Sequence, residues 1–199
     1  MMNTTANTIM KYAASLPEGA TMSAKELLHL GERAAVDQAL SRLVRRGQLL
    51  RVGRGVYTSP VSTRFGERAP APEMIVKSIA ERTGEIITAS GATAANRLGL
   101  TTQNPVKTVY LTSGSTRQLK IGNQIVELRH SPAWKLRGPG SRAGEAMRAL
   151  AWFGPSEVKG KSAVVGKRLT KAERKELMGF RAKTPNWLAQ ELSGLAVSG

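Results

Sequence analysis

The feature that most restricts the fold of this chain is a helical pattern followed at once by two β-prone runs. Between residues 32 and 46, apolar side chains recur at i, i+3, i+4 and i+7, which places them on one buried face of an amphipathic helix. These residues are Val36, Ala39, Leu40 and Leu43. Two β-prone runs, 48–52 and 56–58, then flank Gly53-Arg54-Gly55, where both glycines are expected to adopt positive φ. The sequence therefore predicts a helix over about 32–46 and a hairpin directly after it.

Two shorter helices are predicted before this pair. The first covers about 9–16, where apolar residues again follow a helical period. The second covers 23–29, because Ser23 and Glu26 have the spacing of a capping box. Three helices and a basic hairpin in this order predict a winged helix-turn-helix over residues 1–60, a fold that binds DNA.

Beyond residue 60 the pattern changes. Residues 61–72 mix charged side chains with glycine and proline and are expected to form a linker. Residues 73–199 alternate short helical and β patterns, so the predicted fold class is α+β: an N-terminal winged helix-turn-helix followed by a mixed α+β C-terminal domain. The predicted helices are 73–82, 91–98, 142–152, 155–168, 171–180 and 185–192, and the predicted strands are 85–88, 106–111, 118–121 and 124–128.

The charge balance favours an anionic partner. Thirty Lys and Arg residues stand against fourteen Asp and Glu, a formal charge of +16, and this self-repulsion is relieved by an anion such as nucleic acid. A basic protein that binds no nucleic acid is the alternative on composition alone. Seven cations gather between residues 159 and 175, where they either contact phosphates or an acidic partner or form a solvated helix face.

The outward face of the 32–46 helix and the hairpin after it supply the candidate DNA contacts. Gln38 can pair with adenine, whereas arginines pair with guanine or phosphate, and Arg54 at the hairpin tip can reach a phosphate or the minor groove. Asp37 can orient Arg33 or accept a hydrogen bond from cytosine. The alternatives are a solvated polar helix face and an ordinary surface hairpin. The full predicted set is Arg33, Gln38, Ser41, Arg42, Arg45, Arg46, Arg51 and Arg54.

Motifs for catalysis or metal binding are missing from the sequence. There is no cysteine, only two histidines, no phosphate-binding loop and no paired aspartates, so we expect no enzyme activity, cofactor or metal site. The hydroxyl-rich loops 90–93 and 112–116 can bind an anion or serve as a helix cap and a turn. The first residues lack a signal-peptide pattern and no apolar run reaches membrane-spanning length, so a cytoplasmic protein without membrane contact is expected.

The stretches 34–43 and 46–57, which read AAVDQALSRL and RGQLLRVGRGVY, resemble the N-terminal domain of AbiEi-type antitoxins of type IV toxin–antitoxin systems. The resemblance implies binding to inverted repeats in the protein's own promoter, repression of that promoter, and counteraction of a nucleotidyltransferase-like toxin without a stable complex. It assigns the recognition-helix positions to Arg33, Gln38, Ser41 and Arg42, with Asp37 in the same pattern, and the wing to Arg51 and Arg54. Three alternatives stay open: a plain winged-helix transcription factor with a ligand-sensing or dimerising C-terminal domain, an RNA-binding protein, and an enzyme such as a nuclease, against which the lack of a carboxylate cluster argues.

Overall fold

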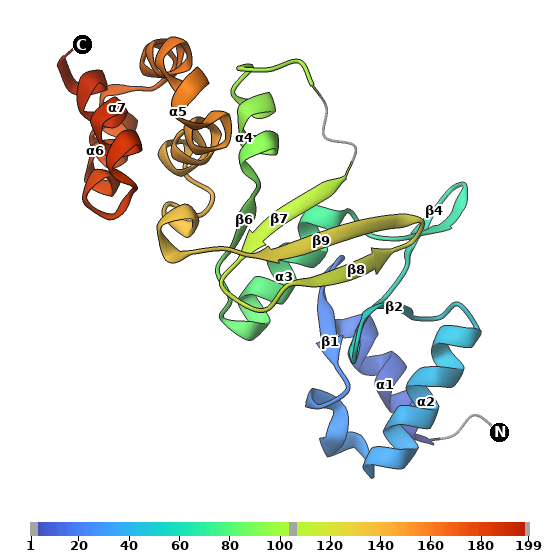
Figure 1. Cartoon of the computed structure of the whole chain (residues 1–199). Helices are drawn as coiled ribbons and strands as arrows, with labels where there is room; N and C mark the ends of the chain where they lie inside the picture. Colours follow the sequence, from blue (N-terminus) through green and yellow to red (C-terminus); the bar gives the residue numbers. More distant parts are fainter. Residues whose placement is uncertain (1–3, 104–106, 198–199) are drawn as a thin grey trace. The chain divides into compact units, whose positions relative to one another are not determined.

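The computed structural model describes residues 4–103 and 107–197 and has the mixed α+β class predicted from the sequence (Figure 1). The chain forms two compact units, and each of them is built from two separate segments of the chain. The first unit comprises Met1–Glu85 and Gln118–Val126, and the second comprises Ile86–Arg117 and Glu127–Gly199. Within the described residues, no helix combines the length and the apolar character needed to cross a membrane.

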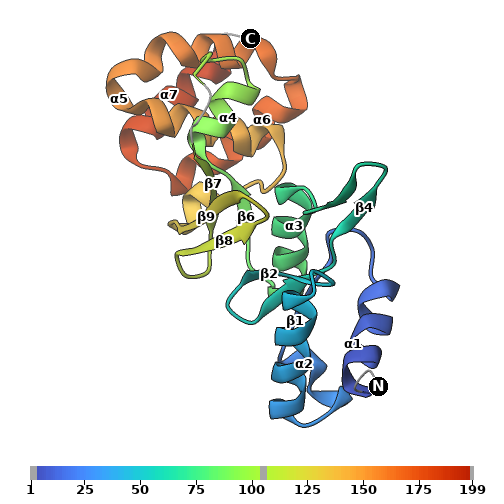
Figure 2. The ribbon, with the colours of Figure 1, turned by 90° about the vertical axis from the view of Figure 1, so that its right-hand side faces the viewer.

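The first unit begins with helices around a small antiparallel sheet (Figure 2). Its strands run in the order β1-β3-β2, so β1 pairs with β3, the last of these three strands in the sequence. The elements are α1 (Thr4–Ser15), β1 (Thr21–Ser23), the 3-10 helix η1 (Glu26–Leu30), α2 (Arg33–Arg45), β2 (Leu50–Gly53) and β3 (Val56–Thr58). The predicted helix at 32–46 and the predicted hairpin are therefore confirmed.

The core of these elements forms as the helical period requires. The four predicted inward residues of α2 are all buried, and they pack with Ile9 of α1, Leu27 of η1 and Leu49. Because this side of α2 is fully used in packing, its other side faces solvent. The core thus fixes which residues of α2 are available to a partner.

The helix predicted at 23–29 is only partly correct. Residues 21–23 form β1, since Ser23 pairs with Val56 in the sheet, and the helical turn starts at Glu26 as a 3-10 helix. The predicted capping pair is nevertheless present: Ser23 N donates to Glu26 Oε2 at 2.9 Å and Glu26 N donates to Ser23 Oγ at 3.1 Å. The same two residues therefore end a strand and begin a helix.

The segment 61–72 is not an irregular linker. Strands β4 (Val61–Thr63) and β5 (Gly66–Arg68) pair as an antiparallel hairpin, with Phe65 85% exposed at its tip. Helix α3 (Pro72–Thr83) follows and belongs to the first unit, because Ser78 Oγ accepts a hydrogen bond of 2.7 Å from Thr21 N. The compact units accordingly divide the chain at residues 85 and 86 instead of within 61–72.

A second sheet has the strand order β6-β7-β9-β8. Its strands are β6 (Ile87–Ala89), β7 (Thr108–Thr112), β8 (Arg117–Ile121) and β9 (Gln124–His130). The hairpin predicted around Gly122 is thus confirmed. The predicted start of a strand at residue 106 lies outside the described residues.

The helices of the second unit pack around a continuous apolar core. They are α4 (Gly91–Arg97), η2 (Ala133–Leu136), α5 (Arg142–Arg168), α6 (Lys171–Phe180), η3 (Arg181–Lys183) and α7 (Asn186–Val197). Helix α5 is interrupted at Gly154, whose φ of 73° is left-handed and which precedes Pro155. The sequence prediction of two helices, 142–152 and 155–168, places this break correctly.

Candidate nucleic-acid interface

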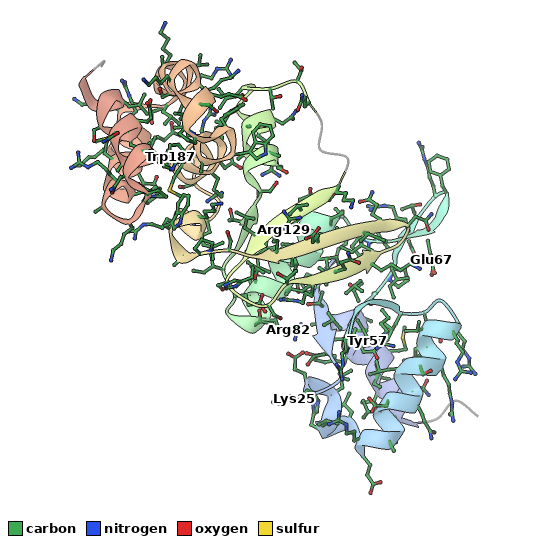
Figure 3. All side chains as sticks on the ribbon, viewed as in Figure 1. Lys25, Tyr57, Glu67, Arg82, Arg129 and Trp187 are labelled. Atoms are coloured by element: carbon green, nitrogen blue, oxygen red, sulfur yellow. The ribbon has the colours of Figure 1, made fainter. Side chains whose placement is uncertain are left out.

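All eight predicted DNA contacts are exposed, on α2, the turn after it, and the β2–β3 hairpin. Figure 3 shows the side chains that α2 projects into solvent, while the labelled Tyr57 of β3 is buried in the core of the unit. Between residues 33 and 54 the chain carries six arginines and a single carboxylate, Asp37. This face is therefore cationic, and the apolar core on the other side of α2 holds it in place.

Polar side chains along the outward face of α2 contact one another one turn apart. Arg33 Nε lies 3.9 Å from Asp37 Oδ2, a distance compatible with an exposed ion pair and with one of the two predicted roles of Asp37. Arg42 Nη2 donates to Gln38 Oε1 at 3.3 Å, and a similar contact of 3.4 Å joins Arg45 to Ser41. Exposed i,i+4 contacts of this kind are worth only about 0.2–0.5 kcal/mol. They can align the side chains in the free protein and then be exchanged for contacts to a base or phosphate.

The β2–β3 hairpin turns over two residues, Arg54 and Gly55. Gly55 has a left-handed φ of 68°, as expected, which is why the tight turn needs glycine there. Gly53 has no positive φ, because it pairs with Val56 inside the sheet; a Cβ on Gly53 would instead lie 3.3 Å from Leu119. The prediction of positive φ is thus correct for Gly55 and wrong for Gly53. The result is a short basic hairpin with Arg54 exposed at its tip.

A buried arginine that sequence reasoning missed lies in the second unit. Arg148 of α5 is 1% exposed, and its Nη1 donates to the carbonyl oxygens of Arg137 at 2.9 Å and Lys135 at 3.4 Å. Burial lowers the pKa of Arg148 to about 10, an effect that the nearby Glu145 carboxylate partly offsets. Its Nε and Nη2 atoms have no hydrogen-bond partner among the described residues. The only sequence signal is an arginine amid small apolar residues of one helix, which does not separate a buried from a solvated side chain.

The sequence matches the DUF6088 model over residues 8–178. The chain belongs to DUF6088, a family of unknown function. No curated protein matches this DUF6088 chain. Among solved structures, it is similar to the crystal structure of the RV2827C protein from Mycobacterium tuberculosis, with a TM-score of 0.54 and 15% sequence identity. That similarity covers 100% of this chain and 78% of the mycobacterial one, and at this level of identity it concerns the fold alone.

In this DUF6088 chain, some of the cations between residues 159 and 175 form contacts within the protein, and others are exposed to solvent. Lys161 Nζ donates to the carbonyl oxygen of Leu100 at 3.1 Å, and Arg168 Nη1 donates to that of Leu98. These two cations therefore fasten the segment after α4 to α5. The exposed cations of the stretch are Lys159, Lys167, Arg168, Lys171 and Lys175. Among the residues the structure describes, no group of three His, Asp or Glu side chains is placed to hold a metal ion.

Proposed function

We propose that this chain binds duplex DNA through α2 and the β2–β3 hairpin and represses transcription from its own promoter. The observation that carries the proposal is the position of β1. It lies between α1 and η1 in the chain yet pairs with β3, and the resulting element order and strand order β1-β3-β2 support a winged helix-turn-helix. In such a domain α2 is the recognition helix and the β2–β3 hairpin is the wing.

The exposed side chains suit that role. A helix of 13 residues is roughly 20 Å long, enough to lie in a major groove and present its N-terminal turns to base edges. Gln38 is the candidate for an adenine, while Arg33 and Arg42 are candidates for guanine or phosphate. Arg51 and Arg54 of the proposed wing are the candidates for contacts to the DNA backbone or the minor groove.

We also propose an antitoxin role, which rests on the resemblance of residues 34–57 to AbiEi-type antitoxins. The protein would act in the cytoplasm as an autorepressor at inverted repeats, with two copies on the DNA. It would counteract a nucleotidyltransferase-like toxin encoded beside it, and this action requires no stable toxin complex. The alternative of a plain winged-helix regulator with a ligand-sensing second unit draws support from Arg148 and the cavity it lines.

DNA binding is tested by fluorescence anisotropy with the full chain, using its own upstream region and a shuffled duplex of equal length at two salt concentrations. We expect a preference for the upstream region that persists at the higher salt. Equal binding to both duplexes, lost as salt rises, means that charge alone drives association. A structured RNA that displaces the upstream duplex stoichiometrically would favour the RNA-binding alternative instead.

The antitoxin role needs a separate test, because DNA binding and toxin neutralisation are separate activities. The nucleotidyltransferase-like gene that the proposal places beside this one is expressed alone and together with this chain, and growth is measured. The Arg54→Ala variant serves as the control, since it removes a wing contact and leaves the second unit intact. Rescue of growth by both forms supports the proposal, whereas failure of the wild-type chain to rescue growth contradicts it.

A further inference from the structure

A cavity of about 360 Å³ lies within the second unit. Its wall comes from the β6–α4 connection, β7, the end of β9, η2 and the first half of α5. The charged side chains in this wall are Arg129, Lys135 and Arg148, with His130 beside them, and none of the lining residues is a carboxylate. Figure 3 shows Arg129 on β9. Every charged residue that lines the cavity is therefore basic.

Arg148 is the residue of this cavity that points most directly to an anionic ligand. A guanidinium has five N–H groups, and here only Nη1 has acceptors, the two carbonyl oxygens near η2. The Nε and Nη2 atoms of this 1% exposed side chain have no partner among the described residues. Leaving a charged group buried with unpaired donors is costly, and an anion taken up in the cavity beside Arg148 would offset part of that cost through its opposite charge.

The nearest carboxylates do not fill this role. Glu145, which lies one turn before Arg148, pairs with Arg97 at 3.0 Å. Glu127 pairs with Arg129 at 3.0 Å. Neither glutamate lines the cavity, so neither supplies the missing acceptor.

The rest of the wall suits an apolar group. Val109, Leu111, Ala151 and Trp152 line the cavity, and Trp152 is 44% exposed although it is the largest side chain there. An indole at the edge of a cavity can pack against a planar ring. The wall thus combines a cationic part with an aromatic one.

We propose that this cavity binds a small organic anion, in which a phosphate or carboxylate group meets Arg148 and an attached planar or apolar group packs on Trp152. Lys135 adds long-range attraction, whereas the charge of Arg129 is largely offset by its pairing with Glu127. Ser90 has a separate role, because its Oγ caps α4 by accepting from Thr93 N. This inference stands independently of DNA binding by the first unit.

The test is isothermal titration calorimetry of the full chain with phenyl phosphate, benzoate, inorganic phosphate and phenol. The two aromatic anions distinguish a phosphate from a carboxylate ligand, and the other two compounds carry only the anion or only the ring. We expect phenyl phosphate or benzoate to bind more tightly than inorganic phosphate and phenol do. The aromatic anion that binds should also quench tryptophan fluorescence in the wild-type chain but not in Trp152→Phe.

Two variants locate the site. Arg148→Gln keeps a donor for the carbonyls of residues 135 and 137 but removes the charge, and we expect affinity to fall by about 10-fold to 100-fold. Ala92→Asp places a carboxylate in the cavity wall at the first turn of α4, where an acid favours the helix, so it should abolish binding while the chain stays folded. Lys175→Gln, an exposed change on α6, is the matched control.

If Arg148→Gln fails to fold, the Ala92→Asp variant alone still tests whether the anion binds in the cavity. Loss of binding in the cavity variants with binding retained in Lys175→Gln supports the proposal. No binding of either aromatic anion to the wild-type chain overturns it. Binding that survives Ala92→Asp, or that is lost equally in Lys175→Gln, also overturns it, since the anion would then sit on the general basic surface.

Discussion

Replacing Gln38 with alanine separates base reading from general DNA affinity. Gln38 is exposed on α2, and its Oε1 accepts one hydrogen bond of 3.3 Å from Arg42. Losing this exposed contact costs about 0.2–0.5 kcal/mol of folding free energy. Alanine returns a similar amount through its higher helix propensity. The free energy of unfolding should therefore change by less than about 0.5 kcal/mol, so any change in DNA binding reports on the interface itself.

A bidentate contact between a glutamine amide and adenine contributes roughly 1–3 kcal/mol of discrimination, or about 5-fold to 150-fold between the preferred base and another. We expect Gln38→Ala to remove this preference at one base position and to leave the other positions unchanged. The assay is anisotropy against a set of upstream duplexes, each altered at a single base pair. An unchanged preference at every position, or a uniform loss of affinity for all duplexes, would refute the assignment of Gln38 to a base edge.

Three further predictions concern the wing, the packing of α5 and the start of α6. Arg54→Ala should weaken binding to all duplexes alike and lower the slope of log K against log salt by about 1, whereas Lys77→Ala on the exposed face of α3 should leave the slope unchanged; equal slopes for both variants would exclude a wing–phosphate contact. Gly144→Ala should destabilise the chain by about 1–3 kcal/mol in chemical denaturation, because its Cβ would overlap the carbonyls of Gly138 and Arg137, while Gly160→Ala, which meets nothing within 4 Å, should stabilise it by about 0.5–1 kcal/mol. The backbone N–H of Thr170 holds the pKa of Glu173 below its ordinary value, so this carboxylate stabilises the fold above its unfolded-state pKa and loses that effect as pH falls through the lowered folded-state pKa. Glu173→Gln should accordingly lower the melting temperature at neutral pH and make little difference at about pH 3, and a constant difference across this range would contradict the argument.

The parts that sequence predicted well are those decided by local periodicity or by a strong backbone signal. The inward face of α2 follows from the spacing of Val36, Ala39, Leu40 and Leu43, and exposure of the opposite face follows from it. The break in α5 follows from Gly154 and Pro155, which no continuous helix accommodates without distortion. These features depend on residues close together in the chain, so a single sequence suffices to find them.

The parts that sequence missed depend on distant partners. Strand β1 is three residues long, and it exists because Thr21, Met22 and Ser23 pair with residues 56–58, far along the chain. Helix α3 was expected in the second domain, yet Ser78 bonds to Thr21 across 57 positions. Arg148 lies amid small apolar residues, and only the fold reveals that its guanidinium is enclosed. Patterns among neighbouring residues do not predict contacts between residues that are far apart in the chain.

The discontinuity of the first unit has a consequence for biosynthesis. Residues 118–126 complete a unit that otherwise ends at Glu85, and β9 continues without interruption from the first unit into the second at residue 126. At ordinary elongation rates the ribosome needs on the order of seconds to deliver this late segment after residue 85. The core beneath α2 uses residues 6–57 and is therefore complete in the chain before that delay, whereas the part of the unit that takes up residues 118–126 must wait for them.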